Sequence, residues 1–407
     1  LTLTATAQRA PQELRATGAI GGVSSPYLPG SVLPVRVAGF DPPYRVAVMG
    51  PGEMVSGGLY AIPANALPGT ALLVAGNAHG LAARSIRIGT PPAAANELLA
   101  VACYDDGVVF HDVAGFTQAG TLAIGGNPTD VAIDQTGRVA TADTQGTTLT
   151  TVGLPSWSVT RTQGVPFADE IAIDATTHAI FATNRDIDGA GALTRVTPAG
   201  EVRQVVTGKT AEGLAIDERR QIVYVANVND DSVVEIDART LATIRRFHAV
   251  DRVFSLELSP DGKTLFAISN QTMEPPLNAP GSAVAIAVGG NARPRVIAQS
   301  AQLTFPIGEA LDAARRTLFV TDEDRNDIYV LDTRTLRPKR APLPTCETPW
   351  KPTLDRGSDR LYVPCAKAGR VDVFDAATLR RVTGAPFVTG GYPLAVSVWH
   401  GSTASKH

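Results

Sequence analysis

The sequence is short of several residues and patterns that would point directly to a function. It contains three cysteines and three methionines, and aromatic residues make up 6% of its 407 positions. No window reaches the ~18 apolar residues that a membrane-spanning helix needs. The G-x-S-x-G, H-E-x-x-H and Walker P-loop patterns are missing, and the six histidines share no metal-ligand spacing. We therefore expect no transmembrane segment and none of the chemistries that these motifs announce.

The charge balance gives no sign of a nucleic-acid partner. The chain has 36 Lys and Arg against 39 Asp and Glu, a net charge of −3, and a pI near 6.1. Nucleic-acid binding would need a clustered basic face, and the pairs Arg245-Arg246, Arg315-Arg316 and Arg380-Arg381 are scattered and expected to be solvated. Because the chain begins at Leu1, we expect a processed or trimmed product without its signal peptide, hence a secreted, periplasmic or cell-surface protein.

The sequence does contain a repeated pattern of short predicted strands. The stretch IVYVANVNDDSVVEIDARTLATIRRF (222–247) alternates apolar and polar residues between Asn/Asp clusters, as short antiparallel strands do. A strand reading GLAID precedes it, and equivalents recur at intervals of 40 to 53 residues. The seven strands are DVAID, EIAID, GLAID, SLELS, GEALD, KPTLD and PLAVSVW, ending at Asp134, Asp174, Asp217, Ser259, Asp312, Asp355 and Trp399. Such a period, with four strands in each repeat, predicts an all-β, seven-bladed β-propeller.

The ends of the repeat region also predict how the ring closes. The last strand, PLAVSVW, has no second, third or fourth strand after it, whereas the region that begins at Glu97 has these three strands without a first. We therefore expect the C-terminal first strand to complete the blade begun by the N-terminal repeat strands, which removes the open edges.

The repeat resembles a known family. The phrases at 222–247, 317–336 and 360–379 resemble the YVTN-type repeat of YncE-like and surface-layer propellers, as does LSPDGKTLFAISN at 258–270. This resemblance implies a propeller over about three quarters of the chain. It names no activity, because propellers serve many unrelated functions.

The N-terminal region lies outside the repeat. Short strand patterns separated by Pro and Gly turns predict a small β-sandwich that resembles an immunoglobulin-like accessory domain without its cysteine framework. We expect a sandwich over 1–92, a propeller over 93–401 and a flexible tail over 402–407. The sandwich would act as a spacer, a docking module or a surface for self-assembly.

Two of the three cysteines are placed to form a disulfide. Cys346 precedes the first strand of the last complete blade and Cys365 ends its second strand, so antiparallel pairing brings both to one rim. We expect a Cys346–Cys365 bridge. Cys103 is expected to be a buried small hydrophobic residue, with a three-thiolate metal site as the alternative.

Residues at the starts of the first strands are candidates for ligand binding, because these strands line the central channel of a propeller. Aligned repeats place several charged and aromatic residues at or beside this position. The candidates are Asp130, Glu170, Glu212, Arg252, Phe254, Glu309, Trp350 and Lys351.

A second group of polar residues follows the second strands and is a candidate metal site. Oxygen donors at this density could hold Ca²⁺ or Mg²⁺, and the pattern resembles that of lactonase-type propellers. The alternative is that these residues form ordinary turns. The candidates are Asp143, Asn184, Asn227, Asn270 and Asp322.

Three functions fit these sequence features. The leading prediction is a non-catalytic binding protein that presents the acidic, Asn-rich propeller face to a protein, glycan or small molecule. The first alternative is a Ca²⁺- or Mg²⁺-dependent lactonase, hydrolase or lyase at the channel mouth. The second is a structural subunit of an envelope or extracellular assembly.

Overall fold

The chain folds almost entirely into β-strands. The computed structural model describes residues 4–5, 12–15, 26–37, 43–77, 80–93, 97–185, 190–270, 280–290, 292–384 and 386–401. Within these ranges the only helix is the short 3-10 helix η1 (Val228–Asp230). No helix in this described part is long and apolar enough to cross a membrane. The predicted tail at 402–407 lies outside the described residues.

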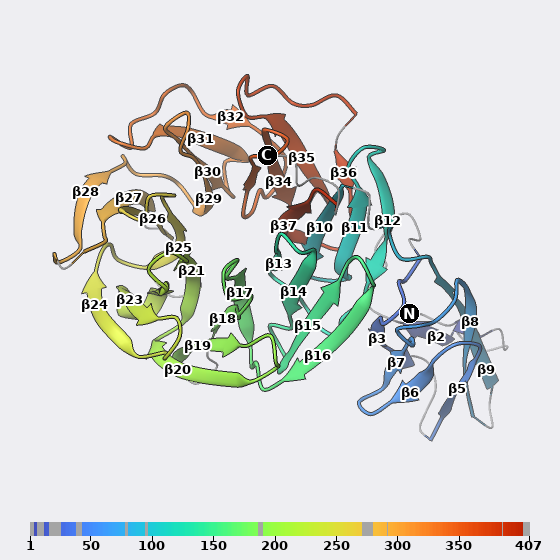
Figure 1. Cartoon of the computed structure of the whole chain (residues 1–407). Helices are drawn as coiled ribbons and strands as arrows, with labels where there is room; N and C mark the ends of the chain where they lie inside the picture. The colour runs from blue at the N-terminus through green and yellow to red at the C-terminus, as the bar shows by residue number, and fades with distance from the viewer. Residues whose placement is uncertain are drawn as a thin grey trace.

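Seven four-stranded antiparallel sheets, counted over the described ranges, are arranged in a ring around a central axis (Figure 1). The first three sheets are β13 (Val131–Ile133), β14 (Arg138–Ala142), β15 (Thr148–Gly153) and β16 (Ser158–Gln163); β17 (Ala168–Ile173), β18 (Ile180–Asn184), β19 (Gly191–Val196) and β20 (Val202–Gly208); and β21 (Ala211–Asp217), β22 (Ile222–Asn227), β23 (Ser232–Asp237) and β24 (Thr243–His248). The next three are β25 (Val253–Leu258), β26 (Thr264–Ser269), β27 (Ser282–Ala287) and β28 (Arg295–Gln299); β29 (Pro306–Asp312), β30 (Thr317–Asp322), β31 (Asp327–Asp332) and β32 (Leu343–Pro344); and β33 (Thr353–Asp355), β34 (Arg360–Cys365), β35 (Arg370–Asp375) and β36 (Phe387–Val388). The all-β propeller prediction is confirmed.

The remaining sheet closes the ring, and it does so as predicted. It contains β37 (Pro393–Trp399), β10 (Leu98–Cys103), β11 (Gly107–Asp112) and β12 (Thr117–Leu122), with β37 antiparallel to β10 from Leu98↔Trp399 onward. Two segments about 300 residues apart in sequence are thus joined by one ladder of hydrogen bonds. Each innermost strand also packs against the next around the channel.

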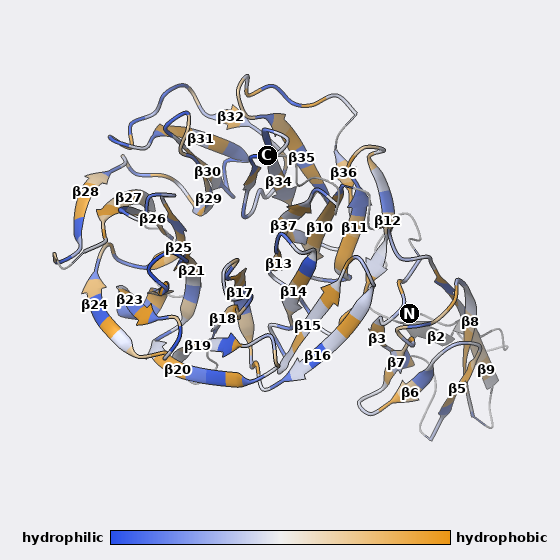
Figure 2. Cartoon of the chain, viewed as in Figure 1, coloured by the Kyte–Doolittle hydropathy of each residue, from blue (hydrophilic) through white to orange (hydrophobic). Residues whose placement is uncertain are grey.

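Apolar side chains fill the spaces between neighbouring sheets. The middle strands β10, β18 and β30 are buried along their whole length, because each is covered by a sheet on both faces. Phe181, fully buried, packs with Leu214 and Val225 of the next sheet. Outer strands such as β20 carry hydrophilic stretches at the rim (Figure 2).

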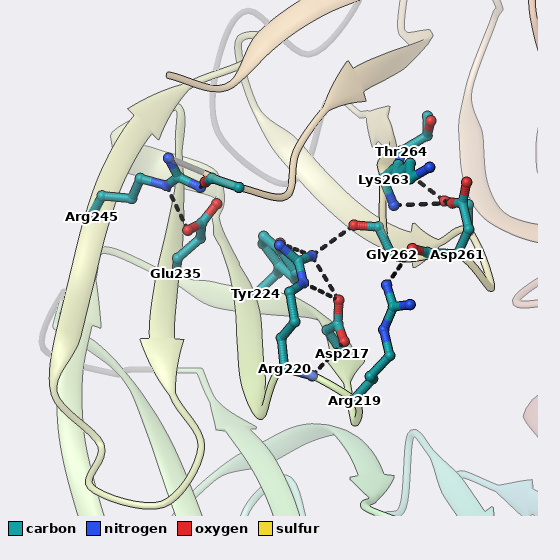
Figure 3. Close-up of polar contacts among 12 residues, drawn as sticks. Asp217, Arg219, Arg220, Tyr224, Glu235, Arg245, Asp261, Gly262, Lys263 and Thr264 are labelled. Carbon is teal, nitrogen blue, oxygen red and sulfur yellow. Dashed lines mark hydrogen bonds and ion pairs between the residues drawn. The ribbon is translucent and has the colours of Figure 1, made fainter. Parts of the chain in front are cut away.

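Polar contacts at the ends of the inner strands join neighbouring sheets at the face where those strands end. Asp217 ends β21 and accepts a hydrogen bond from Arg220 Nε at 2.6 Å (Figure 3). The same guanidinium donates to the Gly262 carbonyl of the following sheet at 2.6 Å. Asp134 and Asp174 likewise cap the turns that follow them. The repeated aspartate is therefore a structural residue.

The N-terminal region forms a separate set of three-stranded sheets. Their strands are β1 (Thr4–Ala5), β2 (Gln12–Arg15) and β4 (Arg36–Val37); β3 (Val32–Pro34), β7 (Leu59–Ala61) and β6 (Glu53–Val55); and β5 (Arg45–Met49), β8 (Gly69–Asn77) and β9 (Gly80–Ile88). Leu33 and Tyr60 of one sheet share a core with Leu73 and Ile86 of another, which is the packing of a small sandwich. The immunoglobulin-like resemblance and the boundary at residue 92 stay predictions.

The segment 26–32 fastens this N-terminal module to the propeller. Tyr27 forms bridges with Ile88 of the module and with Thr121 of β12. Leu28 is fully buried in the propeller core beside Trp157. The indole N–H of Trp157 donates to the Pro29 carbonyl at 2.9 Å. The module is therefore packed against the rim of the ring, beside β12 and β16 (Figure 1).

Candidate functional site

Lys351 lies in the wall of the central channel and holds two of the predicted carboxylates. Its Nζ atom lies 2.9 Å from Asp130 Oδ2 and 3.1 Å from Glu170 Oε1. The lysine precedes β33, the aspartate precedes β13 and the glutamate belongs to β17, so three sheets meet here. Burial by itself would lower the pKa of Lys351, but the two carboxylates outweigh it and raise that pKa. The ammonium therefore stays charged.

Backbone amides fix the positions of both carboxylates. Asp130 accepts hydrogen bonds from the amides of Val131 at 2.8 Å and Ile171 at 3.0 Å. Glu170 accepts one from the Leu214 amide at 2.8 Å. Each carboxylate is thus tied to the next inner strand around the ring. Burial raises the pKa of Glu170, and the Lys351 ammonium opposes that shift.

Glu212 is a further buried carboxyl group near this cluster. It forms an ion pair with Arg185, whose Nε lies 2.9 Å from Glu212 Oε1. Burial raises the pKa of Glu212 well above its ordinary value, the neighbouring Asp169 adds to the rise, and Arg185 opposes it. Asp130 and Glu170 are therefore in direct contact with Lys351, and Glu212 lies near Glu170; the ligand-binding role of these four residues stays a prediction.

A cavity of about 520 Å³ extends from Lys351 along the channel wall. Glu257 and Glu309 line it close to Lys351, and Asp355, Arg356 and His400 line its far end. These last residues follow the ends of inner strands. The cavity therefore runs toward the face where the inner strands end. The sequence had predicted a pocket at the opposite face, where these strands start.

Glu309 is the most unusual group in this cavity. Its exposed fraction is 5%, and neither carboxyl oxygen has a hydrogen-bond partner of normal geometry among the described residues. Burial raises its pKa well above the ordinary value; the Ser255 hydroxyl opposes this, and the nearby Glu257 adds to it. A buried polar group without a partner costs about 1–3 kcal/mol.

Glu257 lies beside it and is poised to exchange a proton near neutral pH. Burial raises its pKa to about 7, while Arg356 and Lys351 pull it back. A second cavity, of about 270 Å³, lies on the other side of Lys351 and includes Asp130 and Ser397. Lys351 lines both cavities.

Besides Glu170 and Glu212, three other candidate ligand residues do not line either cavity. Arg252 and Phe254 lie at the start of β25, where the Arg252 amide donates to Asp231 Oδ1 at 2.6 Å. Trp350 precedes Lys351, and its buried indole N–H has no partner among the described residues. A ligand-binding role for these three residues stays a prediction.

The predicted metal ligands are used mainly by their own sheets and loops. Over the described residues, no hydrogen bond joins two members of this group. Asp143, Asn184, Asn227 and Asp322 accept hydrogen bonds from Asn127 N, Gln204 Nε2, Thr207 Oγ1 and Phe305 N at 3.1, 3.1, 2.8 and 3.0 Å. The buried side-chain amide of Asn270 has no hydrogen-bond partner in the described part of the chain. Such hydrogen bonds are those that Asn and Asp form in ordinary turns. A Ca²⁺ or Mg²⁺ site at these residues stays a prediction.

A disulfide joins Cys346 and Cys365, whose Cα atoms are 5.7 Å apart. Cys103 is a free, fully buried cysteine. Burial raises the pKa of its thiol well above the ordinary value, and the Asp106 carboxylate adds to the rise. The thiol of Cys103 therefore stays protonated and is poorly suited to bind a metal as a thiolate.

Glu257 was not among the residues predicted from the sequence, although the repeat marks it. In the aligned first strands, the other six repeats place Ala, Thr or Ser at its position. A single glutamate among small channel-facing residues was a usable signal. Glu309, which occupies a column of otherwise apolar residues, was predicted from the same aligned repeats.

No protein-family model and no curated protein sequence matches the chain. Among solved structures, it resembles a candidate 6-phosphogluconolactonase of Bacteroides uniformis (TM-score 0.60, 10% identity, 75% of this chain and 99% of that one). It also resembles the periplasmic gluconolactonase of Pseudomonas aeruginosa (0.58, 15%, 74% and 99%). A protein of unknown function from Desulfotomaculum acetoxidans is similar too (0.61, 13%, 75% and 99%). At these identities the likeness establishes the propeller fold, and a quarter of this chain has no counterpart in these neighbours.

Proposed function

We propose that the protein binds a small, uncharged polar molecule in the central channel, at the cavity beside Lys351. The observation that carries this proposal is Glu309, a buried carboxyl group that has the Ser255 hydroxyl nearby, lacks a hydrogen-bond partner of normal geometry among the described residues, and lines a cavity of about 520 Å³. A ligand that supplied donors and acceptors would relieve the cost of burying this group. The volume falls within the range of ordinary small-molecule sites.

The charges around the cavity favour a hydroxyl-rich ligand. Asp130 and Glu170 already neutralise the Lys351 ammonium, so an anionic ligand beside Lys351 would lack a free counter-charge there, and Arg356 lies at the far end of the cavity. The raised pKa of Glu309 leaves a protonated carboxyl group, which both donates and accepts hydrogen bonds, and Glu257, with a pKa of about 7, carries its proton in about half of the molecules at pH 7. Sugars, alditols and sugar lactones have the matching chemistry, and a ligand ammonium is the second choice.

The test is calorimetric titration with neutral monosaccharides, alditols, aldonolactones and small amines. We expect one neutral class to bind, and Glu309→Leu to weaken it by more than tenfold while raising the melting temperature. Glu309→Gln, which mimics the protonated acid, should keep the binding of a neutral ligand and lose that of an amine. The exposed Glu201→Leu serves as the control. If no class binds, or if Glu309→Leu binds normally, the proposal is wrong.

A second candidate is the hydrolysis of a lactone in the same cavity, and the state of Glu257 favours it. A carboxylate with a pKa near 7 can accept a proton from water while the water oxygen bonds to the lactone carbonyl carbon. One Lys351 N–H remains to stabilise the oxyanion, since two point to carboxylates. The ring C–O bond then breaks and its oxygen takes the proton. The names of two structural neighbours support testing this reaction.

The assay is glucono-δ-lactone hydrolysis against pH, corrected for the spontaneous rate. Hydrolysis should rise through pH 7 and fall at least 100-fold in Glu257→Gln. If the lactone binds saturably but is not hydrolysed, the binding proposal would stand and the enzymatic proposal would be wrong.

Localisation and assembly are part of the proposal. A disulfide suits a secreted, periplasmic or cell-surface protein, because cytoplasmic thiols are kept reduced. Self-assembly through the N-terminal module is supported by its exposed apolar residues, namely Met49, Leu67 and Leu81. Light scattering after size exclusion tests assembly, and a monomer at high concentration would remove the structural-subunit alternative.

A further inference from the structure

Four turns from two neighbouring sheets lie together at the face where the inner strands end. They are the connections after β29, β31, β33 and β35, and alternate connections of an antiparallel sheet share one edge. The Thr333 amide donates to the Arg316 carbonyl at 3.2 Å, which joins the first two turns. The Arg315 guanidinium reaches Asp359 of the next sheet at 2.8 Å, and the Ala376 amide donates to the Asp359 carbonyl at 2.9 Å. The four turns thus form one continuous surface, which we name the arginine face.

The arginine face carries an excess of positive charge. Its basic residues are Arg315, Arg316, Arg334, Arg337, Lys339, Arg340, Arg356, Arg360, Arg380 and Arg381, and its acidic residues are Asp312, Asp332, Asp355, Asp359 and Asp375. Asp372, the buried partner of Arg381, lowers the surplus from five positive charges to four, which still stands out in a chain whose net charge is −3. Two of the three basic pairs that were expected to be scattered, Arg315-Arg316 and Arg380-Arg381, therefore fall on one surface.

The acidic residues of this face are already engaged within it. Asp332 and Asp375 accept hydrogen bonds from the residues of their own turns. Asp312 and Asp359 bind Arg315, and Asp355 binds His400 and Ser358. Six exposed arginines, in contrast, form no ion pair with any described residue. They are Arg316, Arg334, Arg337, Arg340, Arg356 and Arg380.

The spread of these arginines indicates an extended anion. A small anion could not contact four turns of two sheets at once, whereas a polymer with regularly spaced charges could. Guanidinium groups form paired hydrogen bonds with carboxylate and phosphate groups. Among the described residues of the face there is no exposed large hydrophobic side chain. The face therefore lacks groups for insertion into a membrane or for stacking on unpaired bases.

We infer that the arginine face binds an acidic polysaccharide. The disulfide supports this partner over a nucleic acid, because it suits an oxidising compartment outside the cytoplasm. The surface adjoins the proposed channel site, because Asp355 and Arg356 also line the far end of the cavity, but the other arginines of the face lie outside that lining. Either function can therefore fail without the other.

The test is binding to immobilised polygalacturonate between 25 and 300 mM NaCl, with duplex DNA and phosphatidylglycerol vesicles in parallel. The variant Arg334→Gln/Arg337→Gln/Arg340→Gln/Arg380→Gln removes four charges from the face. A matched control, Arg203→Gln/Arg239→Gln/Arg293→Gln/Arg295→Gln, removes four exposed charges elsewhere. We expect at least about a tenfold loss of affinity at 50 mM NaCl for the first variant and less than twofold for the control. In a plot of log affinity against log salt concentration, the slope should become less negative by about one for each contact that is lost.

Three outcomes would overturn the inference. They are no binding by the wild-type protein at 25 mM NaCl, equal losses in the two variants, and tighter binding to DNA or vesicles than to the polysaccharide. Far-ultraviolet circular dichroism and melting curves check the folding of both variants. If the quadruple variant misfolds, Arg334→Gln/Arg380→Gln must still lower the affinity by more than threefold.

Discussion

The raised pKa of Glu257 predicts a fall in stability through neutral pH that one substitution should remove. A glutamate has an ordinary pKa of 4.5, and burial raises that of Glu257 to about 7. Between these values the folded protein holds a proton that the unfolded chain has released. Folding stability therefore falls as the pH rises through this window, and the loss is complete above pH 7.

The size of this effect follows from the shift. About 2.5 pH units at ~1.4 kcal/mol per unit give about 3 kcal/mol, and partial contact of Glu257 with solvent lowers this toward about 2 kcal/mol. Over roughly 300 propeller residues, an unfolding entropy of ~2.1 cal/mol/K per residue converts this into about 3–5 °C of melting temperature. Glu257→Gln should lack this component of the pH dependence.

The assay is differential scanning calorimetry of the wild type and Glu257→Gln from pH 5 to pH 8.5. The difference between the two melting temperatures should grow with pH, in favour of the variant, and level off above pH 7.5. Glu201→Gln, on the exposed surface, corrects for the lost charge. A difference that stays constant over this range would refute the reasoning, because it would mean that Glu257 titrates at its ordinary pKa.

Three further predictions concern the parts of the fold that hold the site. Lys351→Met removes the partner of two buried carboxylates and should lower the unfolding free energy by about 3 kcal/mol in urea titrations, whereas Lys351→Arg should lose less; equal losses would contradict a charge-based role. Cys346→Ser opens a disulfide across 19 residues and should lower stability by about 3 kcal/mol, and reductant should bring the wild type to the same value. Cys103→Ser keeps this disulfide and should lose stability with reductant as the wild type does, so a Cys103→Ser variant that is insensitive to reductant would indicate a different pairing. Deletion of 393–407 removes β37 and should abolish the cooperative melting transition, so a truncated protein that still melts sharply would show that the shared sheet is dispensable.

Much of the fold could be predicted from the sequence because the repeat is local. Period-two patterning and Asn/Asp turns mark each strand, and counting the strands predicted the pairing of β37 with β10. The sandwich-like packing of Leu33 and Tyr60 against Leu73 and Ile86 also agrees with the turn spacing. The docking of segment 26–32 could not be predicted, because Leu28 and Trp157 lie more than 120 residues apart and Leu28 lies outside the repeats.

The site was less predictable, for a physical reason. Alignment of the repeats gives the position of a residue along the axis of the propeller. It does not show which neighbouring residues its side chain contacts. It placed Asp130 and Lys351 at one height, and only the closed ring brings them to 2.9 Å. Burial, which distinguishes Glu309 from an ordinary surface glutamate, depends on all seven inner strands together. The turn-forming residues such as Asp143 look identical in sequence whether or not they bind a metal.

The attachment of the N-terminal module has a consequence for how the molecule would work between two partners. Tyr27 bridges both parts, Leu28 is buried in the propeller, and the Trp157 indole holds the Pro29 carbonyl at 2.9 Å. A module held this way keeps a fixed orientation relative to the propeller and transmits force to it. A partner bound to the module and another bound to the ring would be kept at one distance and one angle. The second partner's effective concentration would then be set by the geometry of the protein, and its binding would be strong only where the two targets have matching spacing.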